Sequence, residues 1–227
     1  MHDRGIQRYG FHGLSYDYIA RELAAIEPET AGGRAIVAHL GNGASLCAMD
    51  RGKSVDTTMG FTALDGLMMG TRSGTIDPGL VLHLIAHEGM SAHEVEHMLY
   101  HQSGLLGVSG ASSDMRDLRM LATPEALEAI GLFAWRAARE AAGMLATLGG
   151  LDTLVFTAGI GENDAAMRAS ICERLAFTGI ELDPAANLNH APVISTPDSV
   201  VTVRVLPTDE ERMIARYTAE LVKGHSA

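Results

Sequence analysis

The feature that most constrains the fold is a pair of short apolar runs, residues 35–38 and 44–49, joined by His39-Leu40-Gly41-Asn42-Gly43. Two strand-like runs around a turn with two glycines and an asparagine predict a β-hairpin. Glycines leave backbone N–H groups bare, and a cluster of such groups can hold an anion. The imidazole of His39 adds a donor near neutral pH. Two interpretations stand at this point: an ordinary Asn-Gly turn, or a hairpin that binds phosphate.

The composition is that of a globular protein with one large domain or two small ones, since 47% of the 227 residues are hydrophobic. A net charge of −11 argues against general binding to nucleic acid or to anionic membranes. We expect Cys47 and Cys172 to be reduced packing residues of a cytoplasmic protein, with a single disulfide as the alternative. We expect neither a signal peptide nor a membrane span.

Periodicity and capping residues predict the elements around the hairpin. Ser15 is expected to cap a helix that ends near Glu27. The sheet is expected to continue over residues 55–61, with further strands at 151–157 and 200–206. Gly-rich loops are expected at 66–79 and 103–110. Helices are expected at residues 79–88, 92–101, 124–148, from a turn at 159–163 to about 177, and at about 210–222.

Three junctions between a predicted strand and the following segment share one design, at residues 39–43, 159–163 and 207–211. Ligands of α/β folds lie at the carboxyl ends of strands, and a glycine-rich turn that opens a helix presents N–H groups to phosphate or ribose. Each junction also has a purely structural interpretation. Gly-x-Gly is a common turn, and Asp209-Glu210-Glu211 complements a helix dipole more often than it binds metal.

Two further segments carry charged groups suited to an anionic ligand. Arg72 lies in the long loop between two glycines, and a guanidinium binds carboxylate or phosphate bidentately. The alternative for Arg72 is an ion pair with Asp77. Residues 112–117 bring Asp114 and Arg116 to the start of a helix. Their alternative is an ordinary N-cap with a surface ion pair.

One motif points to different chemistry. His93-Glu94-Val95-Glu96-His97 matches the H-E-x-x-H pattern of zinc proteases, which places two histidines on one face of a helix. Glu96 adds a charge where such helices are usually apolar, and no third ligand stands out. A solvated helix face is therefore the favoured interpretation, and a zinc hydrolase remains an alternative function.

Taken together, seven segments resemble, in the same order, those of acetate kinases. They are residues 8–13, 39–43, 56–61, 70–74, 113–117, 156–163 and 207–211. The resemblance covers essentially the whole chain. It implies an actin-like and sugar-kinase ATPase fold, with a βββαβαβα domain that carries inserted helices. It also implies the reaction of acetate with ATP to give acetyl phosphate and ADP.

The resemblance assigns a role to each site residue. The residues that stabilise the transferring phosphoryl group are His12 and Arg72. The phosphate loop is His39, Leu40, Gly41, Asn42 and Gly43. The adenosine-binding segments are Asp114, Met115 and Arg116, with Gly159, Ile160, Gly161, Glu162 and Asn163. Glu210 is implied as the residue that helps to hold Mg²⁺ or Mn²⁺. Phosphoryl transfer depends on positioning and charge neutralisation, and these residue types supply both.

The chain departs from the family pattern in two ways. Leu14 and Tyr16 stand where the family usually has Thr and His, so the contacts near His12 are expected to differ. The family's N-terminal domain has no counterpart. We therefore expect residues 1–227 to be the C-terminal nucleotide-binding domain of an acetate kinase. The helix at about 210–222 packs in the family on the absent domain, so its apolar residues are expected to be exposed or to dock elsewhere. These residues are Met213, Ile214, Tyr217 and Leu221.

The resemblance also predicts partners. They are ATP, acetate or propionate, a second copy in a homodimer through this domain, and a separate N-terminal half as a further candidate. Acetate and propionate stay undistinguished because the family's acyl pocket draws on both domains. No nucleic acid or membrane partner is expected. A non-catalytic nucleotide-binding or dimerisation fragment is the first alternative function, and a truncated gene product and one piece of a split enzyme are both open origins.

Overall fold

The centre of the molecule is one five-stranded sheet. The computed structural model describes residues 1–26, 28 and 33–224, which form a single domain. The strands are β1 (Arg34–Leu40), β2 (Ala44–Asp50), β3 (Lys53–Thr57), β4 (Thr153–Thr157) and β5 (Thr202–Val205). Their order is β3-β2-β1-β4-β5, with β1, β2 and β3 antiparallel in turn and β4 and β5 parallel to β1. This topology confirms the hairpin and the βββαβαβα arrangement of actin-like ATPases.

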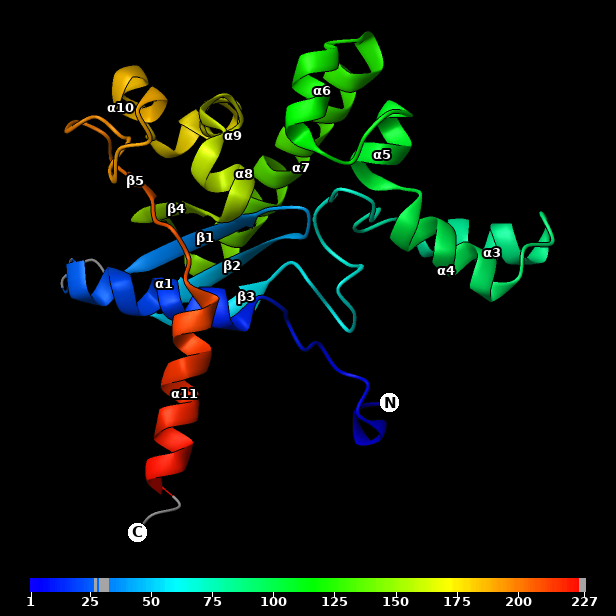
Figure 1. Cartoon of the computed structure of the whole chain (residues 1–227), viewed down its shortest axis with the longest axis horizontal. Helices are drawn as coiled ribbons and strands as arrows, with labels where there is room; N and C mark the ends of the chain where they lie inside the picture. Colours follow the sequence, from blue (N-terminus) through cyan, green and yellow to red (C-terminus); the bar gives the residue numbers. More distant parts are fainter. Residues whose placement is uncertain (27, 29–32, 225–227) are drawn as a thin grey trace.

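Strands β1, β2 and β4 of the sheet are buried on both faces, whereas the edge strand β3 is largely exposed. Side chains alternate along a strand, so Ile36 and Leu40 of β1 face one way and Val37 faces the other. The first face packs on α7 (Pro124–Leu148) and α9 (Ala165–Arg174). The second packs on α1 (Gly13–Ile26), which α11 (Glu210–Gly224) contacts in turn (Figure 1). Burial on both faces explains why residues 35–38 of β1 and 154–156 of β4 are continuously apolar rather than alternating.

Four helices lie between β3 and α7. They are α3 (Pro78–Ala86), α4 (Ala92–His101), α5 (Gly104–Ser109) and α6 (Met115–Leu121). The pair α3 and α4 projects away from the sheet as an arm (Figure 1). The bounds of α4 and α7 agree with the prediction because caps set both starts. Ser91 forms a capping box with Glu94 at the start of α4. At the start of α7, the side chain of Thr123 accepts a hydrogen bond from Ala126 N, and Pro124 is the first helical residue.

Several sequence expectations were wrong in detail. The predicted loop at 103–110 contains α5, whose first N–H groups donate to distant carbonyl oxygens, Leu105 N to Met69 at 2.9 Å and Leu106 N to Gly70 at 3.0 Å. The third strand ends at Thr57. Residues 159–163 belong to a short helix, α8 (Ala158–Asn163). Asp164 then caps α9 through Met167 N at 2.8 Å, so no continuous helix reaches residue 177.

The start of α1 also differs from the prediction. The helix begins at Gly13, directly after His12, whose φ of 59° is unusual for a residue other than glycine. Ser15 lies inside the helix and is buried, so it is not an N-cap. Glu27, the expected last residue of this helix, lies outside the described residues. Two short 3₁₀ turns (His2–Arg4 and Ala176–Thr178) and α10 (Pro184–Leu188) complete the elements.

The terminal helix is largely exposed. Met213 is buried, whereas Ile214, Tyr217 and Leu221 are 54%, 38% and 65% exposed. The helix is attached to α1 by the Tyr217 hydroxyl, which donates to Asp17, and by an ion pair of 3.9 Å between Arg212 and Glu22. Three of the four named apolar residues are thus exposed, as predicted. The docking of this helix on another domain stays a prediction.

The cysteines and the helices answer two other expectations. Cys47 and Cys172 are buried and free, so the alternative of a disulfide between them is wrong. No helix within the described part of the chain combines the length and the apolar character needed to cross a membrane.

Candidate functional site

Two stacked histidines lie at the end of the hairpin. His12 precedes α1 and His39 is the last residue but one of β1. Their ring centroids are 4.0 Å apart with an interplanar angle of 15°. His12 Nδ1 lies 2.8 Å from the Ser45 hydroxyl, and His39 Nδ1 lies 2.9 Å from the Ser15 hydroxyl. Each ring is therefore held through Nδ1, and Nε2 of His12 is left to face the site.

The surroundings keep both imidazoles neutral at pH 7. Burial, reinforced by the nearby Arg72 charge, lowers the pKa of His12 to about 4. Burial, reinforced by His12, lowers the pKa of His39 to about 3. A neutral imidazole has one N–H group, so each ring donates through one nitrogen only.

Arg72 reaches the same point as His12. Its Nη1 donates to the Ala63 carbonyl oxygen at 2.7 Å, which fixes the guanidinium plane. A Cβ placed on Gly43 would lie 2.8 Å from Arg72 Nη2 and 3.4 Å from His12 Nε2. Glycine at 43 therefore leaves open the space on which both donors converge. The alternative pairing of Arg72 with Asp77 is not observed, since Asp77 instead accepts from Gly79 N and caps α3.

The loop that carries Arg72 is fastened to the hairpin tip. Gly70 N donates to the Asn42 carbonyl oxygen at 3.0 Å, and a Cβ on Gly70 would lie 2.0 Å from Asn42 Oδ1. Any side chain at position 70 would push Asn42 aside. The close approach of the two backbones explains why a glycine occupies this position.

A cavity of about 620 Å³ opens beside the hairpin tip, between α6 on one side and α8 with the start of α9 on the other. Eight of the residues assigned by sequence line it: Gly41, Asn42, Asp114, Met115, Arg116, Gly159, Ile160 and Asn163. Further lining residues are Ser113, Arg119, Asp164, Ala165 and Ala166. A volume of this size suits a small organic ligand or a nucleotide.

Charged pairs shape two walls of the cavity. Asp114 caps α6 and pairs with Arg116 at 2.7 Å, and hydrogen bonds from Arg116 hold the pKa of Asp114 at about 2. The N-cap interpretation of this segment is therefore confirmed. Arg119 donates to both oxygens of Asp164 at 2.8 and 2.9 Å, which joins α6 to α9. Sequence reasoning missed this pair. Its signals were an arginine one turn after Arg116 and an aspartate in the N-cap position after Asn163.

Five other residues assigned by sequence lie outside the lining of the cavity. Leu40 is fully buried in the core, and Gly161 is buried against the Phe156 backbone. The Glu162 carboxylate accepts from Ala158 N at 2.8 Å and from Thr208 N at 3.3 Å. This bond joins the end of β4 to the segment after β5. His39 and Gly43 belong to the histidine cluster described above.

The arrangement gives little support to a metal cage. Glu210 is an exposed residue in the first turn of α11, and neighbouring Asp209 accepts from Arg212 N at 2.8 Å as a helix cap would. Within the part of the chain that the structure describes, no group of three His, Cys, Asp or Glu side chains could hold a metal ion. The zinc-like motif is not such a group, because the His93 side chain is 89% exposed and Glu94 is engaged with Ser91.

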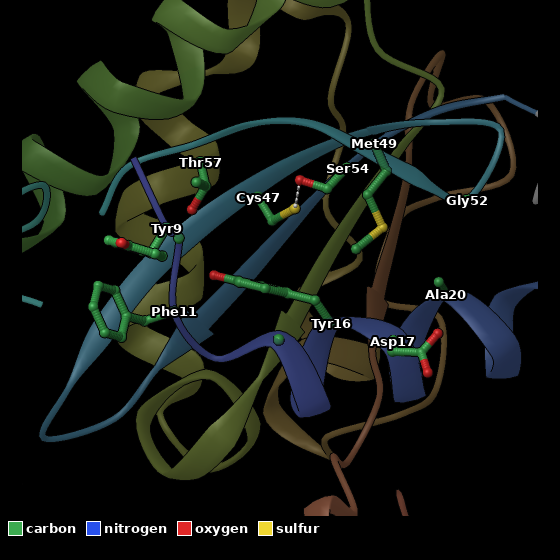
Figure 2. Close-up of a pocket in the computed structure, with 12 residues that line it drawn as sticks. Tyr9, Phe11, Tyr16, Asp17, Ala20, Cys47, Met49, Gly52, Ser54 and Thr57 are labelled. Atoms are coloured by element: carbon green, nitrogen blue, oxygen red, sulfur yellow. Dashed lines mark hydrogen bonds between the residues drawn. The ribbon is translucent and has the colours of Figure 1, made fainter. Parts of the chain in front are cut away.

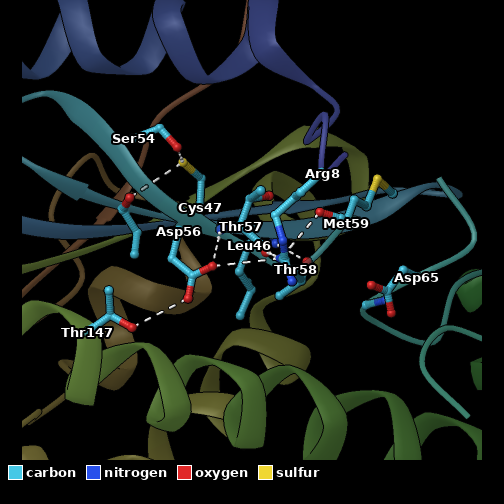
Figure 3. A network of polar contacts seen from close by, with 12 residues as sticks. Arg8, Leu46, Cys47, Ser54, Asp56, Thr57, Thr58, Met59, Asp65 and Thr147 are labelled. Carbon is cyan, nitrogen blue, oxygen red and sulfur yellow. Dashed lines mark hydrogen bonds and ion pairs between the residues drawn. The ribbon is translucent and has the colours of Figure 1, made fainter. Parts of the chain in front are cut away.

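A polar network anchors the segment that leads into His12 (Figure 3). Arg8 donates to the Thr57 carbonyl oxygen and pairs with Asp56 at 3.7 Å, while Tyr9 N donates to the Gly60 carbonyl oxygen at 3.0 Å. A smaller cavity of about 300 Å³ lies between this segment, α1 and the β2–β3 hairpin (Figure 2). Tyr16 and Cys47 line this smaller cavity, which lies on the face of the sheet opposite to α7.

Comparisons with known proteins show the family of this chain. The profile of the Acetokinase family matches residues 1–216. The acetate kinase of Rhodopseudomonas palustris (strain TIE-1) is 55% identical over 225 residues, which are 98% of this chain and 56% of that protein. The acetate kinase of Methylocella silvestris is 53% identical over 227 residues, 100% of this chain and 56% of that protein.

Solved structures give the same answer. The crystal structure of Porphyromonas gingivalis acetate kinase matches with a TM-score of 0.91 at 40% identity, covering 97% of this chain and 57% of that one. A propionate kinase from Francisella tularensis matches with a TM-score of 0.89 at 43% identity, covering 94% and 56%. The chain spans about 56% of the length of the curated relatives it matches. By its sequence and by its fold, the chain belongs to the acetokinase family.

Proposed function

We propose that this chain carries out, or forms part of an enzyme that carries out, phosphoryl transfer between ATP and acetate. The observation that supports this most strongly is the convergence of Arg72 Nη2 and His12 Nε2 over Gly43. Two donors aimed at one point above a glycine turn suit the oxygens of a phosphoryl group. Phosphoryl transfer needs this kind of fixed electrostatic stabilisation more than it needs covalent chemistry.

The two donors have different electrostatic roles in this proposal. Arg72 keeps its positive charge and neutralises charge that spreads over the equatorial oxygens of the transferring group. His12 is neutral and donates one hydrogen bond through Nε2. The Gly41-Asn42-Gly43 tip lies between them and the cavity, so the phosphate chain would cross the tip on its way from the cavity to the donors.

The cavity between α6 and α8 is the proposed site for the adenosine of ATP or ADP. Asp114, Met115 and Arg116 form one wall, and Gly159, Ile160 and Asn163 form the other. The Arg119–Asp164 pair holds the two walls together through two hydrogen bonds between charged groups. Leu40, Gly161 and Glu162 have an indirect role in this proposal. They support the loop and the helix rather than line the cavity.

Mg²⁺ fits this proposal only as an ion shared with the nucleotide. Glu210 offers one exposed carboxylate, and Mg²⁺ typically takes one or two carboxylates together with phosphates and water. When bound, the ion supplies charge neutralisation to the phosphates. Mn²⁺ would serve in the same way.

The described residues are proposed to form one wall of the complete site. The relatives are longer by nearly half of their own length, and α11 presents exposed Ile214, Tyr217 and Leu221 on which another domain or a separate half could pack. The acyl substrate, acetate or propionate, would be held between the two walls. The exposed apolar residues Leu80, Leu82 and Ile85 of α3 support a homodimer. The free cysteines suit a cytoplasmic protein.

Nucleotide binding and turnover test the proposal separately. ADP with Mg²⁺ is titrated calorimetrically into the purified chain, and acetyl phosphate formation from ATP and acetate is followed in a coupled assay. We expect ADP to bind, and Asp114→Ala with Arg116→Ala to weaken it. Turnover is expected to be low for the chain alone and to rise when it is fused to the part of the R. palustris enzyme that it does not match.

Each of three outcomes contradicts a different part of the proposal. A folded chain that binds no ADP contradicts the nucleotide site. A chain that binds ADP and gives no turnover even in the fusion is the non-catalytic nucleotide-binding module instead. Turnover of the chain alone at the level of the fusion contradicts only the proposition that a second wall is required.

A further inference from the structure

A buried tyrosine stands behind the proposed catalytic histidine. Tyr16 is 6% exposed, and its ring extends from α1 along the sheet toward the side of Phe11 (Figure 2). Its hydroxyl makes a short hydrogen bond with the Ser45 hydroxyl, which lies 2.8 Å from His12 Nδ1. Tyr16 is also one of the two positions where the chain departs from the family pattern. The three side chains form a linear relay that ends on the histidine.

The relay has a preferred direction because each hydroxyl has only one hydrogen. If Tyr16 donates to Ser45 and Ser45 donates to His12 Nδ1, every hydroxyl hydrogen in the relay is used. If His12 instead donates to Ser45, the fully buried Ser45 hydroxyl either accepts from Tyr16 as well, which leaves its own hydrogen unused, or donates to Tyr16. In the latter case the phenolic hydrogen would need a further acceptor, and Ser45 is the one partner that Tyr16 Oη has among the hydrogen bonds of the described residues.

The reverse direction is the costlier one. A buried O–H group without an acceptor costs about 1–3 kcal/mol. Tyr16 retains its hydrogen at any ordinary pH, since burial raises the pKa of the phenol well above its usual value. Donation from tyrosine to serine to histidine is thus the arrangement that leaves no buried donor unpaired.

We propose that Tyr16, acting through Ser45, is a positioning residue that keeps the single proton of His12 on Nε2. His12 then presents an N–H group, not a lone pair, at the point above Gly43 that Arg72 Nη2 also faces. An N–H group there attracts an anionic oxygen, whereas a lone pair repels it. The use of this N–H by a phosphoryl oxygen rests on the function proposed above. The position of the proton does not.

The stacked His39 makes the arrangement rigid without taking part in the relay. Its own Nδ1 is held by Ser15, one residue before Tyr16 on α1. The helix therefore fixes both rings of the stack through neighbouring residues. His12 itself sits at a φ of 59°, so its backbone position depends on these contacts.

The tautomer of His12 can be read directly from the nitrogen chemical shifts of the folded chain. Two-bond ¹H–¹⁵N correlation spectra at pH 7 are recorded for the parent chain and for Tyr16→Phe, with His12→Gln used to assign the signals. We expect the parent His12 to be protonated on Nε2 alone. We expect Tyr16→Phe to give a mixture of tautomers, because Ser45 can then either donate or accept.

Kinetics of the active form add a second readout. Tyr16→Phe is expected to lower kcat about fivefold to tenfold with little change in KM for acetate, a loss on the scale of one hydrogen bond. Ser45→Ala should produce a similar loss, and the double variant should be no worse than Ser45→Ala. Tyr18→Phe is the matched control, since Tyr18 lies on the same helix about 200° around from Tyr16.

The outcomes separate this inference from the proposed function. A parent chain with His12 protonated on Nδ1 overturns the inference, whether or not any variant folds. A Tyr16→Phe chain that melts at a lower temperature but keeps the Nε2 tautomer also overturns it, because Tyr16 would then be only structural. The expected spectra together with no turnover even in the fusion support the position of the proton and contradict the proposed function.

Discussion

Two pairs of histidines in this chain invite comparison. His12 and His39 are 27 positions apart in the sequence, yet their rings stack at 4.0 Å inside the molecule. His93 and His97 are one helical turn apart in a motif known for binding zinc, yet both are exposed on α4. The pair with the recognisable spacing has no third partner in the described structure. His12 and His39, which have no recognisable spacing, each have a serine hydroxyl within hydrogen-bond distance of Nδ1. The guanidinium of Arg72 lies beside His12.

The difference teaches that a ligand-like spacing is a weak indicator unless the surroundings restrict the side chains. The Nδ1 bonds and the stacking leave the His12 ring one orientation, and burial leaves it one charge state at neutral pH. His93 keeps most of its surface in water and its nearest charged partner is Glu96 at 3.7 Å. An exposed ion pair such as His93–Glu96 contributes little to the stability of the fold and does little to fix the imidazole in place.

The largest expected effect separates the two pairs by activity. His12→Ala should lower kcat for acetyl phosphate formation by about 100-fold or more, since it removes a donor aimed at the reacting group. His97→Ala should leave kcat unchanged. Both variants are measured in the chain itself. If the chain alone shows no activity, they are measured in the fusion to the unmatched part of the R. palustris enzyme. Equal losses in the two variants would break the comparison.

The second effect concerns the space in front of His12. Gly43→Ala would place a Cβ 2.8 Å from Arg72 Nη2, so the guanidinium must move. We expect kcat to fall about 10-fold while the chain stays folded, because a long side chain can shift at small cost. The assay is the one used for His12→Ala, together with a thermal melt.

Gly143→Ala is the matched control. Gly143 lies on the exposed side of α7, and a Cβ there meets nothing within 4 Å. Alanine should stabilise that helix by about 0.5–1 kcal/mol and leave kcat unchanged. A Gly43→Ala chain with full activity would show that the space between Arg72 and His12 is not where the reaction takes place.

The third effect is a dependence of stability on pH that only the buried pair should produce. The folded-state pKa values of about 4 for His12 and about 3 for His39 lie below the ordinary value of 6.5. Below pH 6.5 the unfolded chain binds protons that the folded chain does not. The stability present above pH 6.5 is therefore lost as the pH falls toward 4 and 3, by up to about 1.4 kcal/mol per pH unit for each histidine.

Urea unfolding at pH 7, 6 and 5 measures this slope. His39→Gln should make the slope shallower, even if it lowers stability at every pH. His93→Gln should leave the slope as it is in the parent chain. A parent chain whose stability is constant from pH 7 to pH 5 contradicts the neutral, buried state of the two imidazoles.

The sequence predicted the sheet and most of the helices because local patterns decide them. Thr123-Pro124 marks the start of α7, and Gly41-Asn42-Gly43 marks the hairpin turn. It did not predict that residues 104–109 are helical, because the carbonyl oxygens that accept from the first N–H groups of this helix belong to Met69 and Gly70, far away in the sequence. It paired His12 with Arg72 only through a family resemblance. The stacking on His39 and the Arg119–Asp164 pair join segments far apart in the sequence, so the local signals at Arg119 and Asp164 do not identify them as partners.

The smallest expected effect is on metal content and on the exposed helix. Glu94, the would-be catalytic residue of the zinc motif, accepts from Ser91 N at 2.7 Å and closes the capping box of α4. These bonds from Ser91 lower the pKa of Glu94. Glu94→Ala should therefore lower the melting temperature slightly, whereas His97→Ala should not change it. Elemental analysis of chain purified without chelators should find no stoichiometric zinc. Zinc bound at one equivalent and lost in His97→Ala would mean that the exposed pair, too, has a function that its surroundings do not reveal.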